Sequence, residues 1–197
     1  MSRTNMIRVV FPIFLLLLCS CSGGTSDFHS ELKNKDWYCN SKMEITKDTF
    51  SDSRNLYKIQ IPDSWWTIEN LVDTIHGVVS IDSSASEMFL EGIAVTTLNM
   101  GGKSFIQYVK SEFDIYTNRG NIDLYEYGRS KLKNDDTYWF LFESQENDTL
   151  NMMNYNLYVE KPDSDTCFLL SSYVDKKENW KTKLCSKKKY LYTFQKL

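Results

Sequence analysis

The chain has 197 residues, including 12 Tyr, 11 Phe and 5 Trp but only 8 Gly and 3 Pro. This length is enough to bury a sizeable core, and the aromatic content excludes an intrinsically disordered chain. The formal net charge is −3, and it becomes −5 if the two arginines of residues 1–20 are removed.

Residues 1–20 predict a secretory signal peptide. Arg3 and Arg8 form a basic start, and residues 9–18 are apolar throughout. A membrane-spanning helix needs about 20 apolar residues, whereas the apolar core of a signal peptide needs about 7–15. We therefore expect this segment to direct export and to be removed.

The sequence Leu18-Cys19-Ser20-Cys21 resembles the lipobox of bacterial lipoproteins. Cys21 has the small Ser20 before it, whereas Cys19 follows the bulky Leu18, so the resemblance predicts lipidation at Cys21. The alternative is an ordinary signal peptide with an incidental cysteine. Acyl chains would anchor the protein to a membrane without crossing it. Because Ser22 stands where Asp is the inner-membrane retention signal, we expect the outer membrane of the bacterial cell envelope.

Residues 21–36 are small and polar and predict a flexible tether, which is followed by one domain over residues 37–197. The first half of that domain predicts four strands and a helix. Alternation indicates strands at 56–61, 65–72, 75–81 and 88–98. A helix over 104–117 should begin with a capping box formed by Ser104 and Gln107.

The second half predicts a meander of strands and a closing helix. Strands are expected at 122–132, 137–144, 150–160 and 166–174. The short turns between them require antiparallel pairing. We expect the closing helix to be capped by Asp175 and Glu178 and to carry an apolar face formed by Trp180, Leu184, Leu191 and Phe194. The predicted class is α+β, an antiparallel β-sheet flanked by helices.

Charge is unevenly distributed along the chain. Residues 22–175 carry 13 basic and 25 acidic side chains, whereas residues 176–197 carry eight lysines and one acid, Glu178. A basic patch for anionic lipid or nucleic acid is one interpretation. The interpretation we favour is an amphipathic helix whose lysines face solvent beside an acidic body. No nucleic-acid partner is expected.

Residues 57–65, Tyr-Lys-Ile-Gln-Ile-Pro-Asp-Ser-Trp, resemble the opening of PsbP-like domains, in which an alternating strand precedes Pro-x-x-Trp. The later order of elements is also similar, and the resemblance spans about residues 50–197. It implies an α-β-α sandwich, no shared catalytic residues, and a role in binding other proteins. The family includes a photosystem II extrinsic protein, a Ran-binding import factor and DcrB-like bacterial lipoproteins. The second tryptophan, Trp66, and the cysteines Cys39 and Cys185 depart from its pattern.

The motifs of several catalytic classes are missing from the sequence. A Ser–His–Asp triad needs a histidine base, and His76 is the one histidine beyond the tether, without a G-x-S-x-G motif. The acidic pairs at 135–136 and 163–165 lie in predicted turns, where Asp is favoured for local hydrogen bonds. Residues 101–104 resemble the last residues of the P-loop motif, but Thr97 stands where that motif has its first glycine. We therefore expect no enzyme activity, cofactor or metal.

The tandem tryptophans predict one core residue and one candidate contact residue. Because strand side chains alternate, Trp65 and Trp66 should point to opposite faces. The PsbP-like motif places Trp65 in the core. An exposed Trp66 would suit a protein partner, and the alternative is a glycan or another ligand. If neither tryptophan has a binding role, both indoles should pack inside the fold.

Besides Cys21, the cysteines that remain after processing are Cys39, Cys167 and Cys185, which in an oxidising envelope predicts one disulfide and one free thiol. The strand from 167 to 174 advances about 23 Å, and the helix that follows recovers only about 12 Å by residue 185. Cys167 and Cys185 would then be about 11 Å apart, beyond the roughly 7 Å that a disulfide allows. Geometry therefore favours Cys39–Cys185.

The Cys21→Ala variant should remain unprocessed or be released from membranes, because it lacks the residue that carries the lipid. Metabolic labelling with a fatty acid measures the effect, with Cys19→Ala as the matched control. Label that persists in Cys21→Ala and is lost from Cys19→Ala would assign the anchor to the other cysteine.

Overall fold

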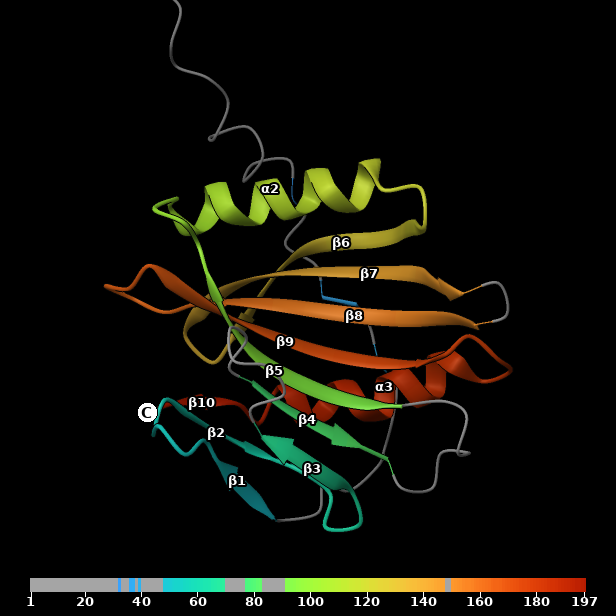
Figure 1. Cartoon of the computed structure of the whole chain (residues 1–197), viewed down its shortest axis with the longest axis horizontal. Helices are drawn as coiled ribbons and strands as arrows, with labels where there is room; N and C mark the ends of the chain where they lie inside the picture. Colours follow the sequence, from blue (N-terminus) through green and yellow to red (C-terminus); the bar gives the residue numbers. More distant parts are fainter. Residues whose placement is uncertain are drawn as a thin grey trace, which may run out of the picture. The chain divides into compact units, whose positions relative to one another are not determined.

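The computed structural model describes residues 32, 36, 37, 39, 48–69, 77–82, 91–147 and 150–197. The predicted signal peptide, Cys21 and His76 lie outside the described residues. The elements, labelled as in Figure 1, are β1 (Thr49–Ser51), β2 (Tyr57–Gln60), β3 (Trp66–Glu69), β4 (Gly77–Ile81), β5 (Gly92–Asn99), α2 (Phe105–Asn118), β6 (Ile122–Leu132), β7 (Asp135–Asn147), β8 (Leu150–Glu160), β9 (Thr166–Asp175), α3 (Trp180–Leu191) and β10 (Gln195–Lys196). In this part of the chain, no helix is long and apolar enough to cross a membrane.

Seven strands form one antiparallel sheet in the order β3-β4-β5-β9-β8-β7-β6. Strands β6 to β9 are the predicted meander, and each pairs with the next in sequence. A second sheet, β1-β2-β10, was not expected from the sequence. It forms because the chain beyond α3 returns to pair with β2. Helices on an antiparallel sheet confirm the predicted α+β class.

Helix α2 covers one face of the large sheet. Gly101 and Gly102 adopt positive φ angles of 62° and 75°, which ends β5 and turns the chain into the helix. The predicted cap is present, since the Ser104 backbone N–H donates to Gln107 Oε1 at 3.0 Å. Aromatic pairs such as Tyr116–Phe142, whose ring centroids are 4.6 Å apart, join α2 to the strands below.

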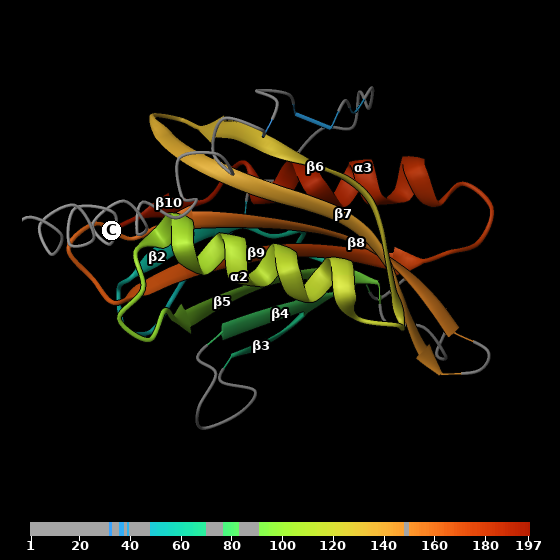
Figure 2. The same ribbon diagram turned by 90° about the horizontal axis from the view of Figure 1, so that it is seen from above.

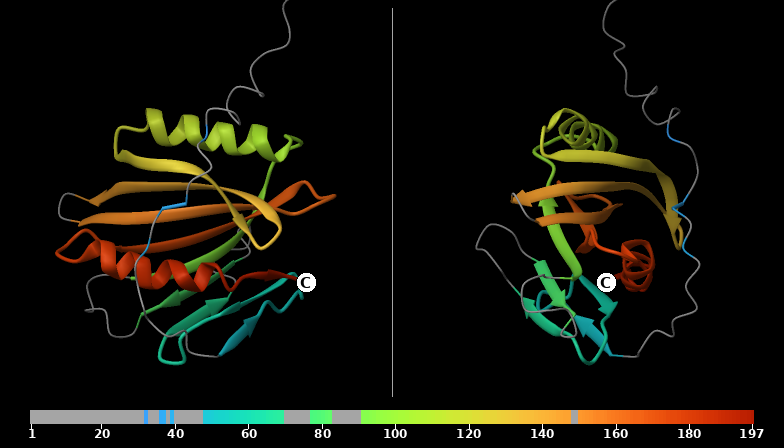
Figure 3. Two further views of the ribbon diagram at one scale, coloured as in Figure 1. Left: turned by 180° about the vertical axis from the view of Figure 1, so that it is seen from behind. Right: turned by 90° about the vertical axis from the view of Figure 1, so that its right-hand side faces the viewer.

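The opposite face of the sheet carries the main core under α3 (Figures 2 and 3). The alternation of β8 determines which side chains point there: Met153, Tyr155, Leu157 and Val159 are fully buried. They pack with Trp139 of β7 and with the apolar side of α3. Trp139 and Tyr155 stack with ring centroids 5.7 Å apart. Because both faces of the central strands are covered, the sheet forms the middle layer between two helices.

Helix α3 differs from its sequence prediction at its start and in its lysines. It begins after Asn179, which has a left-handed φ of 66°, whereas Asp175 is still the last residue of β9. Lys187 and Lys188 were expected to face solvent, but they are 3% and 4% exposed. Each has acidic partners on distant segments, which removes the cost of burying an unpaired charge.

An N-terminal clasp, defined as Asp36, Trp37 and Cys39, holds the start of the domain against α3. Lys188 Nζ donates to Asp36 Oδ1 at 2.9 Å and to the Trp37 carbonyl oxygen at 2.5 Å. The Trp37 ring stacks on Trp180, with centroids 6.3 Å apart. Burial lowers the pKa of Lys188, and its bond to Asp36 opposes that shift.

Cys39 of the clasp is bonded to Cys185 of α3, the pair that the strand and helix lengths favour. Their Cα atoms are 5.3 Å apart and 146 residues separate them in sequence. Cys167 is buried and free. Burial, with a contribution from Glu112, raises the pKa of the Cys167 thiol to about 12, so this thiol is un-ionised at neutral pH and a poor nucleophile.

Replacing Cys39 by Ser should lower the free energy of unfolding by about 2–4 kcal/mol, because the unfolded chain loses a long cross-link. Urea unfolding measures the change. Dithiothreitol is the control, since it should bring the wild type to the same stability and leave the variant unchanged. Non-reducing peptide mapping that finds a bridge at Cys167 would contradict this pairing.

Candidate binding site at the edge of the sheet

The site arises where the chain passes from the small sheet to the large one. The Ile61 backbone N–H donates to the Asp48 carbonyl oxygen at 3.0 Å, which extends the pairing of β1 with β2. Pro62 has no N–H to continue the ladder, so β2 ends there. A turn closed by the Trp65 N–H and the Pro62 carbonyl oxygen, 3.0 Å apart, then leads into β3. This crossing leaves an open space between β1 and β3.

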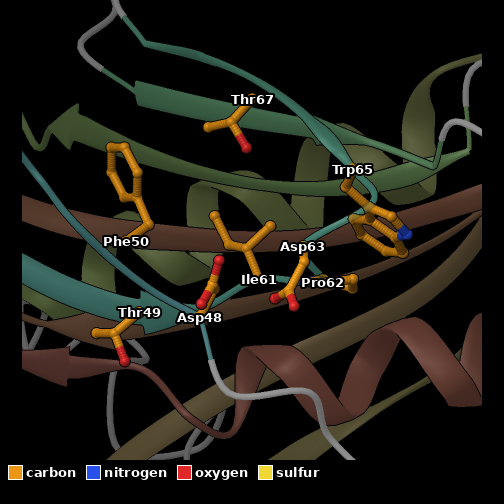
Figure 4. A pocket seen from close by; sticks show the side chains of 8 residues that line it. All are labelled: Asp48, Thr49, Phe50, Ile61, Pro62, Asp63, Trp65 and Thr67. Carbon is orange, nitrogen blue, oxygen red and sulfur yellow. The ribbon is translucent and has the colours of Figure 1, made fainter.

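That space is a pocket of about 400 Å³, which we call the edge pocket (Figure 4). Its volume lies at the lower end of the roughly 300–1,000 Å³ that is typical of ligand sites. Two apolar residues, Ile61 and Pro62, are buried in its wall. The lining consists of Asp48, Thr49, Phe50, Ile61, Pro62, Asp63, Trp65 and Thr67.

Aromatic rings and carboxylates are the two chemical groups that the edge pocket offers. Phe50 and Trp65 are partly buried and pack on the core, and Figure 4 shows their rings at opposite ends of the pocket. Asp48 and Asp63 are exposed. Their carboxylates form no hydrogen bond or ion pair with any residue of the described part of the chain. The pocket therefore has apolar surfaces beside unneutralised negative charge.

The inner side of Trp65 is held by a charged network. Lys187 Nζ lies 5.5 Å from the Trp65 ring centroid and contacts both Asp82 and Glu91, at 3.1 Å and 3.2 Å. Glu91 also accepts from Lys183 Nζ at 2.7 Å. The two lysines and two acids cancel in charge. They hold the inner side of the indole without adding net charge. The net negative charge of the pocket therefore comes from Asp48 and Asp63.

Trp66 lies outside the edge pocket and is 66% exposed. Side chains alternate along a strand, so Trp65 and Thr67 line the pocket while Trp66 points to the other face of β3. Among the described strands, β3 is the terminal strand of the large sheet. Trp66 therefore presents a large apolar ring with a polar N–H at the surface, a residue type that is enriched at protein interfaces.

The sequence-predicted site residues are distributed over different parts of the fold. Trp66 is exposed, as the binding interpretation requires, whereas Trp65 is only partly buried, although a core position was expected. The reason is that Trp65 belongs to the turn before β3 and reaches the core at its rim. Cys39 of the clasp is bonded to Cys185, which lies between Lys183 and Lys187 on α3.

Sequence reasoning missed the other pocket residues, including Asp48, Phe50 and Asp63. They come from two segments with no shared motif, and the turn at residues 62–64 was the one signal available. No group of three or more His, Cys, Asp or Glu side chains within the described residues is placed to hold a metal ion.

The comparisons with known proteins agree on the fold. No family model and no curated protein matches the sequence. Among solved structures, the chain is similar to the cyanobacterial PsbP of Synechocystis, with a TM-score of 0.54 and 12% identity over 82% of this chain and 98% of that one. It is also similar to the Ran-binding protein Mog1p of Saccharomyces cerevisiae, with a TM-score of 0.54 and 12% identity over 77% and 96%. Identities this low show the fold alone, so the domain has a PsbP-like fold.

The two neighbouring tryptophans should respond differently to truncation. Trp65→Ala removes a ring that packs on the core and should lower the free energy of unfolding by about 1–3 kcal/mol, whereas Trp66→Ala should stay within about 0.5 kcal/mol of wild type. Urea unfolding of both variants checks this pair. Equal losses would show that the two indoles have the same environment.

Proposed function

We propose that this protein is a non-enzymatic lipoprotein of the bacterial cell envelope, and that its PsbP-like domain binds a protein partner. Its lipid anchor would be Cys21, and the outer membrane is the proposed location. The observation that carries the binding role is the exposed Trp66 on β3, which is the terminal strand of the large sheet among the described residues. Tryptophan is among the residues that contribute most to protein interfaces.

The geometry of the edge supports a partner that touches both faces of β3. Trp66 lies on one face, and the edge pocket opens on the other. A partner that covers the edge would bury the indole and close the pocket in one interface. Both features belong to described residues whose backbone is held by the pairing of β3 with β4 and of β1 with β2, and by the turn at residues 62–65. Preorganised surfaces of this kind lose little conformational entropy on binding.

The Cys39–Cys185 disulfide supports an extracytoplasmic location. Structural disulfides persist in oxidising compartments such as the envelope and are rare in the cytosol. The short apolar run of residues 9–18 and the lipobox-like sequence ending at Cys21 agree with export. The fold neighbour Mog1p, described as Ran-binding, uses the same architecture to bind a protein. Because a fold does not define a function, this similarity supports the proposal only beside the site itself.

A glycan or another ligand is the second candidate occupant. The observation that favours it is the combination of aromatic rings and carboxylates in the edge pocket, since rings stack on sugars and carboxylates accept from hydroxyl groups. The two functions differ in what is recovered with the anchored protein. A protein partner should be retained in stoichiometric amount, and a glycan receptor should retain none.

Affinity purification of the full, membrane-anchored chain after mild cross-linking should recover a stoichiometric protein, and Trp66→Ala should reduce that recovery at least about tenfold. Ile115→Ala is the matched control, because Ile115 is 47% exposed on α2 and should leave recovery unchanged. Equal recovery with wild type and Trp66→Ala would remove Trp66 from the interface, and no stoichiometric protein at all would contradict the partner-binding role.

A further inference from the structure

We propose that the edge pocket receives a lysine or arginine side chain of the protein partner. This inference rests on the proposed function, because it names what the partner inserts beside Trp66. The occupant is a positively charged group on an apolar stem, and the pocket provides a complementary surface for each of those parts.

Charge is the first argument. Asp48 and Asp63 place two carboxylates at one pocket without a cationic partner in the described part of the chain. Most other acids near this end of the domain are already paired: Asp52 with Arg54 at 3.2 Å, and Glu91 with Lys183 and Lys187. The pocket therefore keeps a net negative charge that attracts a cation and repels an acidic ligand.

The lining rings are the second argument. Phe50 and Trp65 flank the carboxylates, and an indole is the ring that attracts cations most strongly. Ile61 and Pro62 add a buried apolar surface in the same wall. Long basic side chains lay their methylene stem along such a surface while the charged head meets the carboxylates.

The protein already holds a lysine in this way elsewhere. Lys188 Nζ lies 4.7 Å from the Tyr155 ring centroid and 5.6 Å from that of Trp37, and it donates to Asp36 at 2.9 Å. Lys187 repeats the arrangement with Trp65 and two acids. The edge pocket combines the same groups, indole and carboxylate. Lys187 already lies on the inner side of the Trp65 ring, but no lysine of the described chain contacts the carboxylates of Asp48 and Asp63. A partner side chain completes that arrangement.

A sugar is less well matched to the edge pocket than a cation. Neutral hydroxyl groups need donors as well as acceptors around them. The two carboxylates of the pocket only accept, so its side-chain donors are limited to the two threonine hydroxyls and the Trp65 indole N–H. The Thr67 hydroxyl is hydrogen-bonded to the Ser80 hydroxyl, with the two oxygens 2.8 Å apart, so part of its bonding capacity is already taken. Salt dependence separates the two ligands, because a charged ligand loses affinity as ionic strength rises and a neutral sugar does not.

The test uses the full lipidated chain in detergent micelles and three capped tripeptides with central lysine, arginine or norleucine. Norleucine keeps the apolar stem of lysine and lacks its charge. Tryptophan fluorescence and backbone amide shifts of Thr49, Phe50 and Thr67 report on binding. The lysine and arginine peptides should shift these amides and the norleucine peptide should not. Raising NaCl from 50 to 500 mM should weaken binding about fivefold or more.

The double variant Asp48→Asn/Asp63→Asn should lower the affinity for the lysine peptide about tenfold. Asp123→Asn is the matched control, because Asp123 is an exposed acid on β6 outside the pocket, and this variant should bind as wild type does. Equal binding of the norleucine peptide, unchanged binding by the double variant, or salt-independent shifts with a neutral oligosaccharide would each overturn the inference.

The two proposals can fail separately. If a partner is recovered through Trp66 and the double aspartate variant recovers it equally well, the function stands and the pocket inference is wrong. If the lysine peptide binds as expected and no protein is recovered with the anchored chain, the pocket takes a cation but the partner-binding role is wrong.

Discussion

The central strands β7, β8 and β9 carry large side chains on both faces, and this double burial is the constraint on which the rest of the domain depends. An antiparallel sheet commonly leaves one face to solvent. Here Trp139 and Tyr155 point to one face while Phe140 and Tyr158 point to the other, and all four are fully buried. Two covers are therefore required, α2 on one side and α3 on the other. The small sheet and the N-terminal clasp complete the cover on the α3 side.

Covering that second face with a lysine-rich helix creates the charged contacts of the fold. Removing the partner of a buried charge is costly, so Lys187 and Lys188 bind the segments that neutralise them. Lys188 holds Asp36 and Trp37, and the adjacent disulfide fixes the same segment covalently. Lys187 binds Asp82, which directly follows β4, and Glu91, which directly precedes β5. The same helix thus secures the start of the domain and the inner side of the candidate site.

The edge pocket follows from how the two sheets meet. The small sheet packs Tyr57 and Ile59 into the core and then ends at Pro62, so the chain turns at the rim before β3 begins. The turn displays Asp63, and the start of β3 displays Trp66, as side chains that neither sheet has to bury. Rigid strands then position the contact residues, as precise recognition requires.

Local patterns in the sequence predicted the strands of the large sheet, β2, the two helices and the fold class, but not the short strands β1 and β10. The alternation of residues 150–160 predicted β8 and its buried face, because period two is a property of the strand itself. The cap at Ser104 is equally local. Tertiary structure alone decided the burial of Lys188, whose partner Asp36 lies 152 residues away, and the assembly of the edge pocket from two separate segments. A charge or a rim aromatic acquires its role from neighbours that are distant in sequence, and no periodicity along the chain records which segments will meet.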